Sequence, residues 1–286
     1  MRALKEDVSG AVAAFERAAA GVGDLKTALL AALPMQREAA EATLLALVAG
    51  GGVLIDGPVE VRRAFVRAVG RVLGLDCAVV ALQPASRFED ISEPRAARLA
   101  TPQLRRPALA HPVTLIEEVS RTEPRARLAF SAALAEGGPL ACRFVADAGL
   151  SPAEADRLAL RVVVAGEVRG AGPALPGAAG LLAEARAVRA ALPVGERVLT
   201  RALELVRRSR PQDPDAPDAV KAAVARGPGP RAGSALLGLM RARALAAGRA
   251  AATAEDLAAM AAPALDHRLA WREGADRGAA FAALLS

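Results

Sequence analysis

Aromatic side chains are scarce in this chain of 286 residues, which has six Phe, one Trp and no Tyr. Proteins that bind single-stranded nucleic acid usually stack bases on aromatic rings, so the scarcity argues against that class of function. The apolar fraction of 53% is carried largely by Ala and other aliphatic residues. We therefore expect an aliphatic core between closely packed helices.

Cysteine and histidine are also rare. Cys77 and Cys142 are isolated, with no Cys-x-x-Cys pair and no neighbouring His. A disulfide framework or a zinc site needs several such residues at short spacing. We predict no metal site, and we interpret both cysteines as small buried side chains in a reducing compartment.

Long apolar runs are absent as well. The longest, residues 43–55, contains three glycines and is shorter than the roughly 20 residues that a transmembrane helix needs. The first residues include no apolar stretch typical of a signal peptide. We therefore expect a cytoplasmic protein without membrane insertion.

Lysine is nearly missing, since it occurs only at Lys5, Lys26 and Lys221, and the net charge of +6 comes from arginine. The arginines are spread along expected helix faces. A basic protein can bind nucleic acid, but a positive charge by itself is not specific for it. We favour solvated faces and subunit contacts, and we do not expect a nucleic-acid partner.

Strand and helix patterns alternate over the first two thirds of the chain. Strands are expected at 53–56, 78–82, from 112 and at 160–167, with a hairpin strand at 140–145; helices are expected at 8–20, 24–49 (broken at Pro34), 60–73 and 124–136. Residues 83–111 should hold loops and a short hairpin or insert. Strands that are apolar along their length predict a parallel sheet covered by helices on both faces.

Strand patterns cease from about residue 195. Helices are expected at 196–209, 216–225, 231–247 and 253–262. We therefore predict two domains: an α/β core over residues 1–194, with N-terminal helices, and a small all-α domain over residues 195–286.

The stretch 52–73 predicts a buried strand, a tight turn and an amphipathic helix, which is the setting of a phosphate-binding loop. Such a loop reads G-x-x-x-x-G-K-[ST]: its backbone N–H groups cradle phosphates, Lys neutralises them and Ser/Thr holds Mg²⁺. Here Gly57 and Pro58 are followed by VEVRR. The strand, turn and helix are present, but the glycines, the lysine and the metal ligand are not.

Four stretches follow a known pattern in the same order: LLALVAGGGVLIDGP at 44–58, LDCAVVALQP at 75–84, VTLIEEVSRTEPRARLAFSAALAEG at 113–137, and 227–269, which begins GPGPRAG and ends DHRL. Together they resemble the MoxR family of AAA+ ATPases. The resemblance implies an AAA+ P-loop type core, a helical lid, and assembly into a ring with ATP at the subunit boundaries. It also implies chaperone-like remodelling of partners, which often include a protein with a von Willebrand factor A domain.

The resemblance places nucleotide-binding positions at Gly57, Pro58, Arg62, Arg63 and Arg231. Arg62 falls in the lysine position, where its wide guanidinium is a poor substitute for a compact ammonium group. Arg63 falls in the Ser/Thr position and would bring a positive charge to the Mg²⁺ site. Arg231 matches the lid arginine that senses the γ-phosphate, although a surface arginine at a helix start would look the same.

The resemblance also assigns the catalytic positions. Glu118 matches the glutamate that polarises the attacking water, and Glu117 replaces the aspartate that holds Mg²⁺. Two glutamates at a strand end would equally fit a solvated sheet edge. The residue that orients water from the neighbouring strand would fall at Glu167 or Val168, and the arginine finger is lost, with Arg186 as a remote candidate.

These departures predict the loss of ATP hydrolysis, because phosphoryl transfer depends on many positioned charges acting together. We interpret the chain as a pseudo-ATPase scaffold or adaptor in a homo- or hetero-oligomeric ring with AAA+ subunits, for which Mg·ATP is a doubtful cofactor. The alternative is an active MoxR-type chaperone with an atypical loop. Without a phosphate at the turn, Arg62 and Arg63 are expected to pair with Glu60, Glu117 or Glu118.

Overall fold

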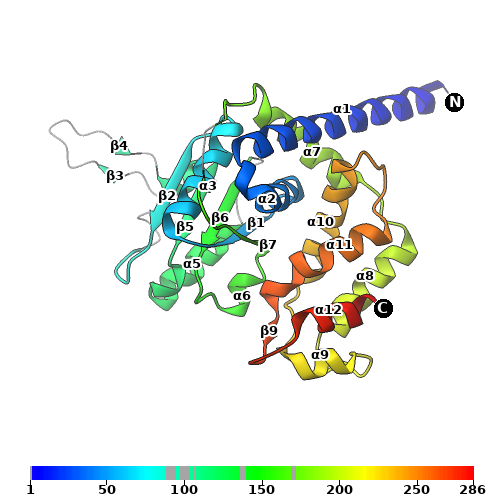
Figure 1. Ribbon diagram of the computed structural model, residues 1–286. Helices are drawn as coiled ribbons and strands as arrows, with labels where there is room; N and C mark the ends of the chain where they lie inside the picture. The colour runs from blue at the N-terminus through cyan, green and yellow to red at the C-terminus, as the bar shows by residue number, and fades with distance from the viewer. Residues whose placement is uncertain (1, 88–94, 97–103, 106, 136–139, 169–171) are drawn as a thin grey trace.

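The computed structural model describes residues 2–87, 95–96, 104–105, 107–135, 140–168 and 172–286 (Figure 1). Five strands form one sheet in the spatial order β2 (Cys77–Ala81), β5 (Val113–Glu117), β6 (Cys142–Ala146), β1 (Gly52–Asp56) and β7 (Leu158–Val163). All neighbouring pairs are parallel. Their carboxyl ends therefore meet at one edge of the sheet and their amino ends at the opposite edge.

Successive side chains along each strand point to opposite faces and fill two cores. Phe144 and Leu160 belong to the larger core, and Ile116 belongs to the smaller core with Phe130 of α5 (Pro124–Ala135). The helices that cover the larger core beside the sheet include α1 (Arg2–Ala32), α2 (Arg37–Ala49), α3 (Val59–Val72) and α7 (Ala178–Ala191), and helices of the C-terminal part extend the same core. Burial on both faces explains why the strands are apolar along their whole length.

The C-terminal part of the chain is a helical lid. Its helices are α8 (Glu196–Arg208), α9 (Asp218–Ala223), α10 (Ala232–Ala246), α11 (Ala254–Leu265) and α12 (Arg277–Leu285). α10 packs against α2, α7 and β7, so the lid lies directly on the core (Figure 1). A short antiparallel ribbon of β8 (Val224–Arg226) and β9 (Ala270–Trp271) adds to the helices that the sequence predicted.

The predicted parallel sheet with helices on both faces and a C-terminal lid is confirmed. A 3₁₀ turn at Pro34–Gln36 separates α1 from α2, as expected at Pro34. Within the segment expected to hold a short hairpin, β3 (Arg95–Ala96) pairs antiparallel with β4 (Leu104–Arg105).

Two expectations are wrong. α1 runs unbroken through Gly21 and Gly23, because buried Val22 and Leu25 hold that stretch against the core, which outweighs a cost of about 1 kcal/mol per glycine. The strand expected in a hairpin at 140–145 is β6, which instead lies in the middle of the sheet, parallel to β5 and β1.

Among the described residues, no single helix is long and apolar enough to cross a membrane. The segments Ser9–Ala32 and Pro34–Ala49 meet that description only together, as a pair bent by 111°. Both segments bury leucines in the core, among them Leu25, Leu29, Leu44 and Leu47.

Candidate functional site

The turn after β1 consists of Gly57 and Pro58 only, since α3 begins at Val59. Gly57 has a φ of +137°, and a Cβ there would lie 2.1 Å from the carbonyl oxygen of Val164. Glycine is therefore required at this position. Two residues are too few to wrap several backbone N–H groups around a phosphate, as a glycine-rich loop does. The expected strand, turn and helix are present without that cradle.

Arg62 and Arg63, at the start of α3, both contact Glu117 at the carboxyl end of β5. Arg62 Nε donates to one carboxylate oxygen at 2.7 Å, and Arg63 donates to the other from Nη2 at 2.6 Å and from Nε at 2.8 Å. Arg62 also donates to the carbonyl oxygen of Gly57 at 3.1 Å. Glu117 is only 1% exposed, so two guanidinium groups neutralise a buried carboxylate.

We call Arg62, Arg63 and Glu117 the arginine clamp. The hydrogen bond to Glu117 raises the pKa of Arg63, so this side chain stays charged. Glu60 lies 3.9 Å from Arg63 but is 86% exposed, and exposed pairs contribute little. The pairing expected from the residue types is present, and Mg·ATP at this turn would have to displace charge-assisted hydrogen bonds from both carboxylate oxygens. In this arrangement the turn does not fit Mg·ATP.

Glu118 follows Glu117 but takes no part in the clamp. Its φ of +63° is the only positive φ of a non-glycine residue in the described part of the chain, and it costs about 1–2 kcal/mol. Its side chain pairs with Arg121 at 3.1 Å. Together with Asp56 and Arg62 it lines a cavity of about 450 Å³ beside the turn. Backbone strain of this kind often occurs at functional sites.

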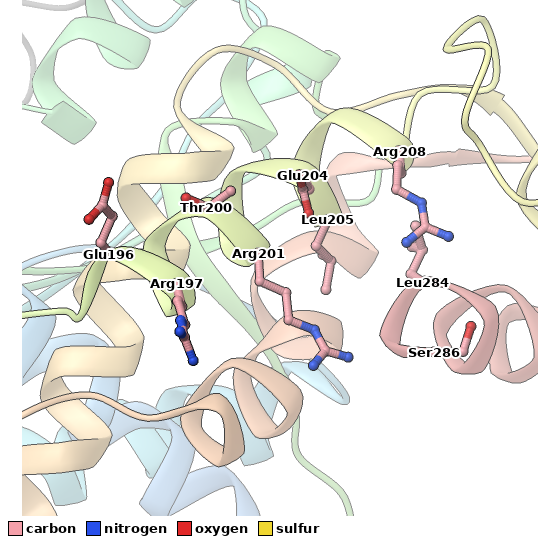
Figure 2. A pocket seen from close by; sticks show the side chains of 9 residues that line it. All are labelled: Glu196, Arg197, Thr200, Arg201, Glu204, Leu205, Arg208, Leu284 and Ser286. Atoms are coloured by element: carbon pink, nitrogen blue, oxygen red, sulfur yellow. The ribbon is translucent and has the colours of Figure 1, made fainter.

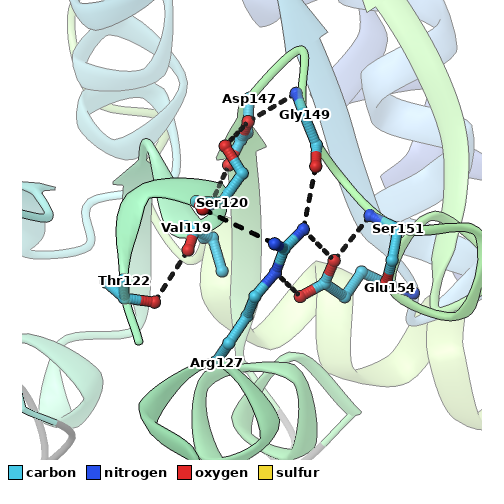
Figure 3. Close-up of polar contacts among 8 residues, drawn as sticks. All are labelled: Val119, Ser120, Thr122, Arg127, Asp147, Gly149, Ser151 and Glu154. Carbon is cyan, nitrogen blue, oxygen red and sulfur yellow. Dashed lines mark hydrogen bonds and ion pairs between the residues drawn. The ribbon is translucent and has the colours of Figure 1, made fainter. Parts of the chain in front are cut away.

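Asp147 also lines this cavity and was missed by the sequence analysis. The neighbour of β5 toward β1 is β6 rather than β7, so the residue that follows the strand beside β5 is Asp147 and not Glu167 or Val168. One Asp147 oxygen accepts from Ser120 Oγ and from the Gly149 N–H, each at 2.7 Å, and the other accepts from the Ser120 N–H (Figure 3). The sequence signal that could have identified Asp147 was an acidic residue directly after the mostly apolar stretch CRFVA.

A second ion pair holds the loop that follows β6. Arg127 of α5 donates to the two oxygens of Glu154 at 2.7 and 2.9 Å and to the Gly149 carbonyl oxygen at 2.8 Å (Figure 3). Burial raises the pKa of Glu154, but hydrogen bonds from Arg127 and Ser151 outweigh burial, so the pKa lies below its ordinary value. The carboxylate therefore stays ionised, and the loop is fixed between β6 and α5.

The two other arginines singled out from the sequence lie elsewhere. The Arg231 N–H donates to Asp156 at 3.0 Å, and Asp156 precedes β7 at the amino edge of the sheet, opposite the turn. Arg186 donates to the carbonyl oxygen of Leu47 at 2.7 Å. Neither arginine lines the cavity beside the turn.

A cavity of about 540 Å³ lies in the lid between α8 and the end of α12 (Figure 2). Arg201 and Arg208 extend from α8 toward α12, and Arg201 donates to the Leu285 carbonyl oxygen at 2.7 Å. Three Arg and two Glu line it, so its charges nearly balance, and no residue singled out from the sequence reaches it. In the described ranges no three His, Cys, Asp or Glu side chains gather to hold a metal ion.

Comparison with known proteins gives the fold a name. Residues 217–284 match the AAA lid domain family. The chain is similar to a predicted ATPase from Cytophaga hutchinsonii ATCC 33406, with 15% identity and a TM-score of 0.78 over 100% of this chain and 98% of that chain. It is also similar to a full-length MCM homologue from Methanopyrus kandleri, with 14% identity and a TM-score of 0.57 over 90% of this chain and 62% of that chain.

No curated protein sequence matches the chain. At these identities the structural likeness concerns the fold, which is the α/β fold of AAA+ ATPases with a helical lid.

Proposed function

We propose that this chain is a MoxR-like AAA+ subunit that keeps the fold without hydrolysing ATP and serves as a scaffold or adaptor in a chaperone-like remodelling or assembly complex. The observation that carries the proposal is the arginine clamp. In the MoxR-like alignment its two guanidinium groups take the places of the phosphate-binding lysine and the Mg²⁺-binding hydroxyl. The guanidinium groups that could bind phosphate are thus hydrogen-bonded to a carboxylate of the chain itself.

The energetics of the clamp support this proposal. Removing one partner from a buried ion pair costs about 3–5 kcal/mol, because a buried charge is left uncompensated. A nucleotide that pulled Arg62 away from Glu117 would have to offset part of such a cost. Glu117 is already paired with two guanidinium groups, so its buried charge needs no Mg²⁺ or nucleotide for compensation. A buried charge that is compensated without nucleotide is consistent with a subunit that acts as a scaffold.

Partners follow from the same proposal. The subunit would sit in a homo- or hetero-oligomeric ring with AAA+ subunits, in which a hydrolysing paralogue supplies the turnover. A protein with a von Willebrand factor A domain is the kind of partner that the MoxR resemblance suggests.

One observation favours the alternative, an active MoxR-type chaperone with an atypical loop. Glu118, in the position of the catalytic glutamate, and Asp147 both line the cavity beside the turn. An active enzyme would need the clamp to open and release Glu117 for Mg²⁺.

Two measurements separate these functions. A fluorescent ATP analogue is titrated with and without Mg²⁺, and phosphate release from Mg·ATP is followed for the wild type, for Glu118→Gln and for the matched control Glu123→Gln. We expect no saturable binding that requires Mg²⁺ at micromolar analogue, and no phosphate release above background in any of the three. Turnover that Glu118→Gln abolishes and Glu123→Gln leaves intact would overturn the proposal in favour of the active chaperone.

A further inference from the structure

The amino edge of the sheet carries a second arginine cluster, on the side opposite the clamp. Here the start of β7, the end of α7 and the start of α10 meet, where the lid lies on the core (Figure 1). A cavity of about 170 Å³ opens between them, and we call it the seam cavity. The basic residues that line it are Arg157, Arg189, Arg231 and Arg268.

The seam cavity has a single acidic residue, Asp156, and that residue is already engaged. Asp156 accepts a hydrogen bond from Arg268 Nε at 3.2 Å and another from the Arg231 backbone N–H at 3.0 Å. Arg268 is 4% exposed and also donates to the carbonyl oxygens of Ala159 and Leu158. This pair fastens the lid to the core and leaves no negative charge for the other arginines.

Arg189 is the most confined of these other arginines. Its Nη2 lies 3.6 Å from the place that a Cβ would take at Gly50, and its Nε is buried without a hydrogen-bond partner. Burial lowers the pKa of Arg189, and the nearby charges of Arg241 and Arg186 lower it further. A half-buried guanidinium among like charges is an unfavourable arrangement that an anion would relieve.

The described part of the chain contains no carboxylate within ion-pair distance of Arg157, Arg189 or Arg231, although many of its other arginines have one. The paired arginines, for comparison, include Arg62, Arg63, Arg127, Arg161, Arg207, Arg243, Arg249 and Arg277. Other described arginines, such as Arg197 and Arg241, also lack a carboxylate partner, so the seam cavity is distinguished by how closely its arginines are confined rather than by the missing ion pairs alone.

The basic surface continues past the seam cavity. An adjoining cavity of about 480 Å³ shares Asp156 and Arg231 with it and adds Arg210 and Arg226. Gly227 and Gly229 line this second cavity, and a side chain at Gly229 would strike the Asp156 carboxylate. A ligand held in the smaller cavity thus has a basic, glycine-lined space into which it can extend.

We propose that the seam cavity binds a small polyphosphate anion of about pyrophosphate size, held by Arg157 and Arg189 with Arg231 at the mouth. Several uncompensated cations call for a ligand with more than one negative charge, and the planar guanidinium fork matches phosphate oxygens. The smaller cavity has no room for a base and a sugar. The anion is either free polyphosphate or the phosphate chain of a nucleotide whose remainder lies in the adjoining cavity. The proposal does not depend on the function of the turn after β1.

The test is calorimetric titration of the full chain with sodium pyrophosphate at low and at physiological ionic strength. The wild type is compared with Arg189→Gln, with Arg157→Gln, and with Arg197→Gln, which removes the same charge from an exposed arginine of α8. We expect one saturable site whose affinity falls about tenfold or more in each seam variant, as for lost hydrogen bonds between charged groups. Arg197→Gln should stay within about twofold of the wild type, because a remote exposed charge is largely screened.

A competition arm identifies the source of the anion. If ATP without Mg²⁺ displaces pyrophosphate and Arg189→Gln weakens both, the phosphate chain of a nucleotide is the ligand; if ATP does not compete, the ligand is free polyphosphate. Circular dichroism melting checks that the variants fold. If Arg189→Gln does not fold, the comparison between Arg157→Gln and the wild type decides the test. Absence of saturable pyrophosphate binding, or equal losses in Arg197→Gln and the seam variants, would overturn the proposal. The ATP arm is repeated with Arg62→Gln, so that binding at the turn is recognised separately.

Discussion

The arginine clamp and the seam cavity use the same side chain under opposite conditions. At the clamp, Arg62 and Arg63 share the buried carboxylate of Glu117. At the seam cavity, Arg157 and Arg189 face no carboxylate, because Arg268 already occupies the only one. Both clamp arginines have a carboxylate partner without any ligand, whereas Arg157 and Arg189 have none among the described residues. A count of arginines therefore says little about binding until the acid that each one faces is known.

The largest effect should come from breaking the clamp at its acid. Glu117→Gln removes the charge-assisted hydrogen bonds of two partly exposed guanidinium groups, and we expect a loss of about 3 kcal/mol in the free energy of unfolding. Urea denaturation measures it. The control Glu60→Gln removes an 86% exposed carboxylate and should change stability by no more than about 0.5 kcal/mol. Equal small effects in both variants would mean that the clamp contributes no stability.

A second test of the comparison concerns the charge of the seam cavity. Asp156→Asn removes the one negative charge that lines it. Arg268 loses its buried partner, so we expect a loss of about 3 kcal/mol in stability. Pyrophosphate affinity should rise several-fold in the fraction that remains folded, because the cavity becomes more positive. Calorimetry combined with urea denaturation measures both, and a weaker affinity for pyrophosphate would contradict the charge argument.

A pH titration probes the contact between the lid and the core beside the seam cavity, where His267 Nε2 lies 3.0 Å from the carbonyl oxygen of Leu158. Burial, followed by the charge of Arg268, lowers the pKa of His267 from 6.5 to about 3. Between these values the unfolded chain binds a proton that the folded chain does not. Stability should therefore fall as pH falls through this window, by up to about 1.4 kcal/mol per pH unit.

Urea denaturation between pH 7 and pH 5 tests this, where the expected loss is about 2 kcal/mol. His267→Gln should flatten the dependence, and His111→Gln, which changes the chain's other histidine, should keep it. Asp256 does not interfere, because hydrogen bonds from Arg249 and the Thr253 backbone outweigh burial and lower its pKa to about 2. The stability that Asp256 contributes is lost only as pH falls below about 4. An unchanged slope in His267→Gln would assign the acid sensitivity to another group.

The smallest effect is expected at the mouth of the seam cavity. The Arg231 side chain is exposed, so its contact with a bound anion is screened by solvent and worth about 1 kcal/mol or less. Arg231→Gln should weaken pyrophosphate binding by about two- to fivefold and leave the melting temperature unchanged. A loss of pyrophosphate affinity as large as that in Arg189→Gln would indicate that the anion binds mainly at the lid surface rather than inside the cavity.

Local patterns were sufficient for most of the elements that carry the candidate site. The apolar run before Gly57 and the amphipathic helix after it correspond to β1 and α3, and the acidic end of the strand from residue 112 corresponds to Glu117 and Glu118 on β5. These features depend on neighbouring residues, so they can be read from periodicity and turn chemistry. Pairing of Arg62 and Arg63 with a nearby glutamate was also foreseeable, since opposite charges at adjacent elements neutralise each other.

Other features depended on contacts that no local pattern contains. Asp147 was missed because it reaches the cavity only through the place of β6 between β5 and β1. The order of strands in a sheet cannot be inferred from the sequence of a single strand. Arg231 matched a nucleotide-sensing position by its surroundings in sequence, but packing of α10 on α2 and β7 placed it at the amino edge of the sheet. The break expected around Gly21 was overridden by burial of the residues beside it.

The sequence by itself determined that this chain forms a helix-covered parallel sheet with a lid, because burial and periodicity act within each segment. It also determined that the turn after β1 carries no G-K-[ST] sequence, because that depends only on which residues are present. Only the tertiary structure decided which glutamate pairs with Arg62 and Arg63 and which arginine pairs with Asp156, because these contacts join residues 54 or more positions apart at the clamp and 112 apart between Asp156 and Arg268.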